Sequence, residues 1–244
     1  MTSLTLLAID SSTGNASLAI ARDNEVLAEL TWCCRQNHSV ELMPNINRLL
    51  EQIGIDIRSV GGIIVARGPG SFNGLRVGIS TAKGLAFGLG VPIVGISTLE
   101  AAAYQYVEAG LPVCPILNAG RGEIAAAIYK QEGKWQQVIA EHISTIDDLC
   151  PKIESKTIFC GELTPSIIEE LTIRLEQKAI IPPPSTVLRR AVFIAALGLK
   201  RLQSGDCDQP SALQPIYLRR PQITQPKYKN RTANQGKKPE SETG

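Results

Sequence analysis

The chain has 244 residues, 43% of them hydrophobic, and a formal net charge of +2, so it is long and apolar enough for one large domain or two small ones. No apolar run approaches the roughly 20 residues of a membrane span, and the first residues lack the basic region of a signal peptide. The six cysteines are scattered without a CxxC pair, which excludes a disulfide framework and indicates a cytoplasmic protein with reduced thiols.

The N-terminal part predicts three short strands joined by tight turns, over residues 4–9, 16–21 and 26–32. Strands this close in sequence usually pair as antiparallel neighbours. A helix follows from Ser39 to Gly54, because apolar residues recur there at three- and four-residue intervals.

The stretch 61–99 predicts a strand, a glycine-rich turn, a helix and a second strand. The first strand, at 62–66, is a short β-branched run of the kind that is buried on both faces. The helix runs from Gly74 to about Leu89, with Asn73 as its expected cap. Each glycine inside a helix costs about 0.5–1 kcal/mol relative to alanine, so we expect another backbone to approach this helix closely.

A second module is predicted from residue 112 onward, after a helix that Ser97 or Thr98 caps and that ends near Val107. Its expected elements are strands at 113–117, 124–129, 136–139 and 157–160 and helices at about 164–175 and 188–202. Residues 219–238 hold seven Lys/Arg and no acid, whereas residues 1–218 have a net charge of −3. With almost no large apolar residue after Pro221, we expect a disordered basic tail.

This order of elements matches the ribonuclease H-like half of the actin/Hsp70/sugar-kinase architecture. We therefore predict an α/β, two-lobed fold with mixed sheets flanked by helices. The expected boundaries are an N-terminal lobe at 1–110, a smaller C-terminal lobe at 111–220 and the tail at 221–244. A ligand in such a fold lies at the carboxyl ends of the strands.

Several motifs in order along residues 1–220 resemble the TsaB family, the dimerisation subunits of the bacterial tRNA threonylcarbamoyladenosine biosynthesis complex. They are LLAIDSST at 6–13, ARGPGSFNGLR at 66–76, GISTAKGLA at 78–86, GISTLEA at 95–101, AGRGE at 119–123 and PIYLR at 215–219. The family commonly has Asp and Arg where this chain has Asn118 and Gly120, which weakens any anion or metal site there.

The resemblance implies a non-catalytic subunit in the formation of N6-threonylcarbamoyladenosine next to the tRNA anticodon. Its partners would be the catalytic paralogue TsaD and the ATPase TsaE, with a homodimer when the chain is alone and tRNA contacted through the complex. TsaD-like enzymes carry an HxxxH metal pair, which this chain cannot form from His38 and His142. We therefore expect no cofactor on this chain, and ATP and metal on the partner proteins. The alternative is a self-sufficient actin-like ATP-dependent transferase or metallohydrolase.

Three places could carry chemistry. Asp10, Ser11 and Ser12 occupy the phosphate-turn position, where a strand-end Asp can orient Mg²⁺ and turn N–H groups can hold phosphate. The interpretation we favour is a hairpin turn whose Asp bonds the backbone.

The turn at 68–74 is neither a Walker A nor a GxGxxG motif, and we interpret it as a tight turn that seats Phe72 in the core. Cys33, Cys34 and His38 could hold a metal, although inert thiols are the commoner case.

The helices near 40–53 and 74–89 carry apolar or small residues over more of their circumference than one sheet can cover. They either pack only on their own sheet or, as we favour, also meet two equivalent helices of a partner in a four-helix contact. The predicted contact residues are Leu42, Ile46, Leu49, Ile53, Gly74, Gly78, Thr81, Leu85 and Gly88. The basic tail either contacts tRNA phosphates or simply keeps the protein soluble.

Overall fold

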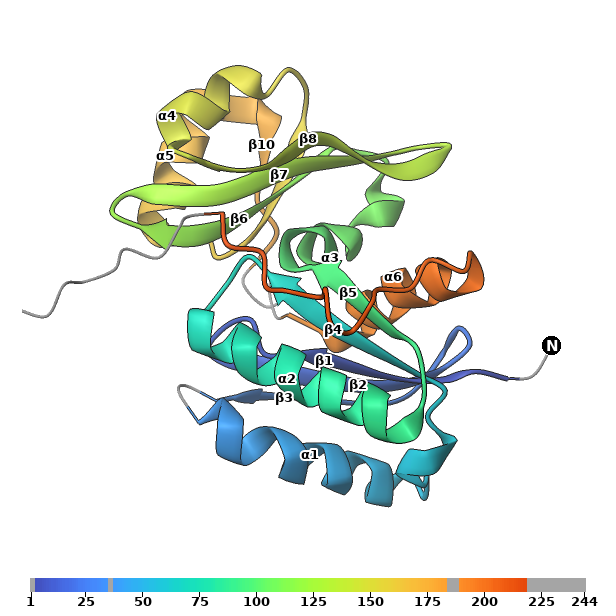
Figure 1. Ribbon diagram of the computed structural model, residues 1–244. Coiled ribbons are helices and arrows are strands. Elements are labelled where there is room, and N and C mark those ends of the chain that lie inside the picture. Colours follow the sequence, from blue (N-terminus) through green and yellow to red (C-terminus); the bar gives the residue numbers. More distant parts are fainter. Residues whose placement is uncertain (1–2, 35–36, 184–188, 219–244) are drawn as a thin grey trace, which may run out of the picture.

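The computed structural model describes residues 3–34, 37–183 and 189–218. They form two five-stranded sheets that lie in separate lobes, with helices on the faces of both (Figure 1). The strands of the first sheet are β1 (Thr5–Asp10), β2 (Asn15–Arg22), β3 (Glu25–Cys33), β4 (Gly62–Gly68) and β5 (Ile93–Ser97). Those of the second are β6 (Val113–Gly120), β7 (Glu123–Glu132), β8 (Lys134–Ser144), β9 (Thr157–Gly161) and β10 (Ala179–Ile180).

The two sheets have the same topology. The first has the order β3-β2-β1-β4-β5, in which β1, β2 and β3 are antiparallel and β4 and β5 run parallel to β1. The second repeats this as β8-β7-β6-β9-β10, with the same directions. This duplicated ribonuclease H-like sheet confirms the predicted two-lobed actin/Hsp70/sugar-kinase-like fold.

Both faces of the first sheet are covered, which explains why residues 6–9 of β1 are all apolar. Leu7 and Ile9 pack into the core under α1 (His38–Gln52) and α2 (Phe72–Leu89), which lie side by side on one face. Leu6 and Ala8 point to the other face, where they meet α6 (Ala191–Gln203). Alternate side chains of one strand therefore supply two cores.

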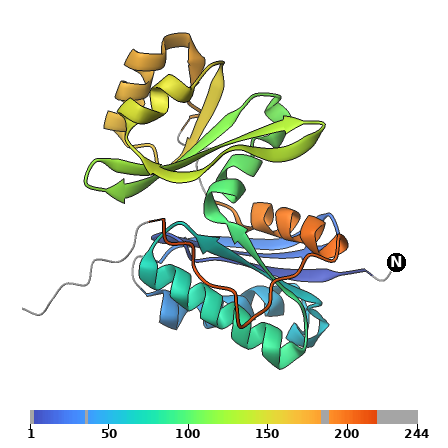
Figure 2. The same cartoon turned by 45° about the horizontal axis from the view of Figure 1, so that its top comes forward.

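In the second lobe, α4 (Ile146–Leu149) and α5 (Pro165–Leu175) cover one face of the sheet. The other face meets α3 (Thr98–Tyr104), whose Leu99 and Ala103 pack against Val113. Figure 2 shows α3 at the junction of the lobes. Short 3₁₀ turns complete the described structure: η1 (Ile57–Ser59), η2 (Val107–Ala109), η3 (Cys150–Lys152) and η4 (Glu176–Lys178). None of the helices in the described ranges is long and apolar enough to cross a membrane.

The chain returns to the first lobe after the second, so the predicted C-terminal lobe at 111–220 is wrong at its far end. Helix α6 packs on β1, β2 and β5. The segment 204–218, which we call the strap, then runs back along the first lobe (Figure 1): Asp208 pairs with Ile93, and the N–H of Ile216 donates to the carbonyl of Arg67 at 2.7 Å. The predicted tail at 221–244 lies outside the described residues.

Candidate functional site

The turn between β1 and β2 is held together by hydrogen bonds among its own residues. Asp10 is only 3% exposed, and its Oδ1 accepts hydrogen bonds from the N–H of Ser12 at 2.9 Å and from its hydroxyl at 2.5 Å. The Ser12 hydroxyl oxygen also accepts from Arg189 Nη1 at 2.8 Å. The carboxylate therefore bonds its own turn, as in the hairpin interpretation, and a guanidinium lies beside it.

Ser11 contacts the first half of α2. Its hydroxyl donates to the carbonyl of Gly74 at 2.8 Å. A Cβ on Gly74 would lie 2.1 Å from the Ser11 carbonyl oxygen, and one on Gly78 would lie 2.1 Å from the Ser11 hydroxyl oxygen. The backbone that approaches this half of the helix is thus that of the chain's own turn. This corrects the prediction that Gly74 and Gly78 contact a partner.

The start of α2 differs from the sequence prediction in two respects. The N-cap is Ser71, whose hydroxyl oxygen accepts from the N–H of Gly74 at 3.3 Å, and not Asn73. Phe72 is 40% exposed instead of seated in the core. Its ring lies 5.3 Å from that of Tyr217 in the strap, and the Arg76 guanidinium lies 4.3 Å from its centroid.

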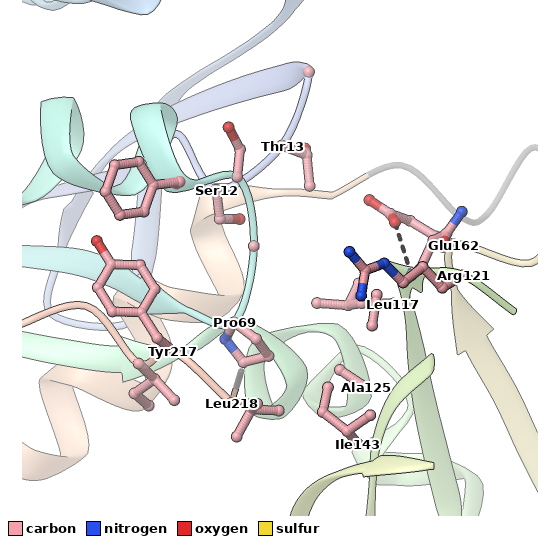
Figure 3. Close-up of a pocket in the computed structure, with 17 residues that line it drawn as sticks. Ser12, Thr13, Pro69, Leu117, Arg121, Ala125, Ile143, Glu162, Tyr217 and Leu218 are labelled. Atoms are coloured by element: carbon pink, nitrogen blue, oxygen red, sulfur yellow. Dashed lines mark hydrogen bonds between the residues drawn. The ribbon is translucent and has the colours of Figure 1, made fainter. Parts of the chain in front are cut away.

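A cleft of about 620 Å³ lies between the lobes (Figure 3). Ser12 and Thr13 lie at one side of it, and Glu162 and Arg121 come from the second lobe on the other side. Glu162 Oε2 accepts from the N–H of Asn118 at 3.1 Å. Apolar side chains fill much of the remaining wall: Pro69, Phe72, Leu117, Ala125, Ile143, Ile216, Tyr217 and Leu218.

The proposed metal set of Cys33, Cys34 and His38 is not assembled. His38 Nε2 lies 2.8 Å from the carbonyl oxygen of Thr13. Burial, followed by the hydrogen bond to Glu41, raises the pKa of the Cys34 thiol to about 11, so the metal-binding thiolate is disfavoured. Throughout the part of the chain that the structure describes, no group of three His, Cys, Asp or Glu side chains could hold a metal.

The predicted contact residues divide into three groups. Leu42, Ile46 and Leu49 are at most 3% exposed and belong to the core, so they present no surface to a partner and their assignment is wrong. Gly74 and Gly78 contact the β1–β2 turn instead. The remaining four reach the surface at least in part: Ile53, Thr81, Leu85 and Gly88.

The two helices also carry residues that are exposed to solvent. Phe87 of α2 is 89% exposed, and Val40 and Met43 of α1 are 67% and 38% exposed. A Cβ on Gly84 or Gly88 would meet no atom of the described residues within 4 Å. We call these five residues the outer helix face. Phe87 was not among the predicted contact residues, which followed the glycines of α2. An exposed aromatic residue among polar ones, one turn from Gly84, was the available signal.

The profile of the TsaD family, described as tRNA N6-adenosine threonylcarbamoyltransferase, matches residues 32–222. The tRNA threonylcarbamoyladenosine biosynthesis protein TsaB of Bacillus subtilis is 31% identical, covering 88% of this chain and 94% of its own length. TsaB of Buchnera aphidicola subsp. Schizaphis graminum is 29% identical over 73% of this chain and 88% of its own. YeaZ from Pseudomonas aeruginosa shares the fold, with a TM-score of 0.75, 24% identity, and coverage of 88% of this chain and all of its own. Sequence and fold agree, and the chain belongs to the TsaB family.

Proposed function

We propose that this chain is a non-catalytic subunit in the formation of N6-threonylcarbamoyladenosine in tRNA. It pairs with the catalytic paralogue TsaD through α1 and α2, and the ATPase TsaE joins the pair. The tRNA is engaged through the assembled complex, and ATP and metal are held by the partner proteins.

The observation that carries this proposal is the outer helix face. A phenylalanine that is 89% exposed forgoes about 1.5–3 kcal/mol of burial free energy, which a partner surface would recover. Beside it, Gly84 and Gly88 leave room for another helix to approach closely. The arrangement is that of an unfilled helix–helix contact.

The family match supports TsaD as the occupant. The TsaD profile covers both α1 and α2 of this chain, so we expect TsaD to have equivalent helices. Two molecules of one fold can bring the same helix pair together about a pseudo-twofold axis and form a four-helix contact. When TsaD is absent, a second copy of this chain can take its place.

The closed β1–β2 turn supports the non-catalytic role. An actin-like transferase needs a strand-end carboxylate that is open to a metal or to water. Here the Asp10 carboxylate is buried and its Oδ1 accepts from Ser12, whose hydroxyl oxygen also accepts from the guanidinium of Arg189. A positive charge beside the turn disfavours a metal cation there.

Pairing is tested by sedimentation velocity of the full chain mixed with TsaD. We expect Phe87→Ser to weaken the heterodimer at least tenfold, and to make the isolated chain monomeric. Ile173→Ser is the matched control, since Ile173 is 69% exposed on α5 of the other lobe. Equal affinity of the two variants would contradict the assignment of the outer helix face.

The role in modification is tested by reconstitution of tRNA modification with TsaD and TsaE. We expect no product when the chain is omitted, and nearly full product with an Asp10→Asn variant that still pairs. Calorimetry with ATP and Mg²⁺ should show no heat of binding to the chain alone. Micromolar ATP binding with turnover, or loss of modification by a folded and paired Asp10→Asn protein, would favour the alternative enzyme.

A further inference from the structure

A second cavity between the lobes, of about 510 Å³, has a polar and charged wall. Arg67 at the end of β4 and Glu100 of α3 line it from one lobe, and Tyr129, Trp135 and Glu141 from the second sheet. The strap residues Ile216 and Leu218 line both this cavity and the cleft of Figure 3. The volume is within the range of small-molecule sites. We call it the charged cavity.

Two acidic side chains of this cavity, Glu100 and Glu141, act on each other. Glu141 Oε1 accepts from the hydroxyls of Ser97 and Tyr129, which fix the carboxylate in place. Burial, followed by the charge of Glu141, raises the pKa of the Glu100 carboxyl, so the two acids lie close enough to repel each other. A cationic group between them would relieve this repulsion.

The aromatic wall favours the same kind of group. The rings of Tyr129 and Trp135 stack with centroids 5.6 Å apart and an interplanar angle of 5°. Aromatic faces attract ammonium and guanidinium groups, and more strongly when these are removed from water. Two carboxylates beside stacked rings are a suitable environment for an amine.

Arg67 provides the opposite charge. Its side chain crosses Gly95, where a Cβ would lie 3.0 Å from Arg67 Cδ, and its Nε is buried with no hydrogen-bond partner among the described residues. Arg201, the other arginine of the cavity, differs because Asp206, Asp208 and the carbonyl of Gly95 take its N–H groups. A buried donor without an acceptor is costly, and a guanidinium matches a carboxylate in geometry.

We infer that the charged cavity binds a free amino acid as a zwitterion, with its ammonium group between Glu100 and Glu141 and its carboxylate on Arg67. Neither half of the ligand satisfies the cavity alone: an amine leaves Arg67 Nε without an acceptor, and a carboxylate leaves the repulsion between Glu100 and Glu141 in place. This inference does not depend on the proposed pairing with TsaD.

The test is titration of the isotope-labelled full chain with each common L-amino acid in turn, followed by NMR. We expect at least one to shift the amide signals of residues 95–100 and 135–137. For the tightest binder, the analogue without the carboxylate and the analogue without the amine should each bind at least tenfold more weakly. Absence of any such shift, or an analogue that binds as tightly as the amino acid, overturns the inference.

Two variants separate the site from general effects on the fold. Arg67→Gln and Glu141→Gln should each weaken binding at least tenfold; the second keeps an acceptor for Ser97 and Tyr129. Arg174→Gln is the matched control, because Arg174 pairs with Asp147 in the second lobe. Unchanged affinity in either cavity variant, with native far-UV and near-UV circular dichroism, also overturns the inference.

Discussion

The two halves of α2 use glycine for opposite purposes. In the first half, Gly74 and Gly78 admit the chain's own β1–β2 turn, and the space that a Cβ would need is already taken by Ser11. In the second half, Gly84 and Gly88 face empty space next to an exposed Phe87. One helix thus shows both an internal contact that fixes the fold and an open surface suited to a partner.

The largest effect is expected for Gly74→Ala. The new methyl group would lie 2.1 Å from the Ser11 carbonyl oxygen, so α2 or the turn must move. We expect a loss of about 3 kcal/mol in the free energy of unfolding, measured by urea denaturation. Because the obstacle is a backbone atom, Ser11→Ala should not restore stability. A Gly74→Ala protein as stable as wild type would contradict the inner contact.

Gly78→Ala should destabilise by about 2 kcal/mol, but its obstacle is a side-chain atom, the hydroxyl oxygen of Ser11. Once Ser11→Ala removes that oxygen, the nearest Ser11 atom is Cβ, at 3.4 Å. The double variant should therefore recover to within about 1 kcal/mol of wild type, the remainder being the lost hydrogen bond to the Gly74 carbonyl. A double-mutant cycle that is additive would refute this explanation.

Gly84→Leu tests the outer half. The isolated chain should fold normally, because the space beside Gly84 is empty, whereas a bulky side chain would keep a partner helix away. We expect the affinity for TsaD to fall about tenfold, or about 1.4 kcal/mol, in sedimentation or calorimetry. Unchanged affinity together with a stable fold would place the partner elsewhere.

The smallest effect is expected for Gly84→Ala in the isolated chain. Alanine is preferred over glycine inside a helix, and here it meets no neighbour, so thermal unfolding should show a gain of about 0.5–1 kcal/mol. Together with Gly74→Ala, one type of substitution then has opposite signs in the two halves. A loss of stability at Gly84 would mean that the outer half already has an internal contact.

The order of strands and helices could be predicted from hydrophobic periodicity and turn residues, and so could the two-lobed fold class. The duplication of the sheet topology was not predicted, because no internal repeat is visible in the sequence. Which side of α2 packs on the sheet could not be predicted. The glycines of α2 suggest one contact side, but the buried side is centred on Leu75, Ile79, Ala82 and Ala86. A glycine in a helix is compatible with another backbone packed closely against it and equally with an empty surface. The sequence alone does not distinguish these two cases.

The same limit applies to α1. Its apolar stripe of Leu42, Ile46 and Leu49 was recognised, but it is used entirely by the core under the sheet. Likewise, Arg189 lies 177 residues from Ser12 in sequence, and no local pattern connects an arginine to a turn so far away. Periodicity identifies which residues need a neighbour, whereas the identity of that neighbour depends on tertiary packing.

The return of α6 to the first lobe has a consequence for how the protein is made. Leu6, Ala8, Ile64 and Val94 share a core with α6, so that face of the first sheet stays uncovered while the second lobe is synthesised. A nascent chain released before residue 203 would expose this apolar face to water. The first lobe is therefore the last to be completed on the ribosome, although its strands emerge first.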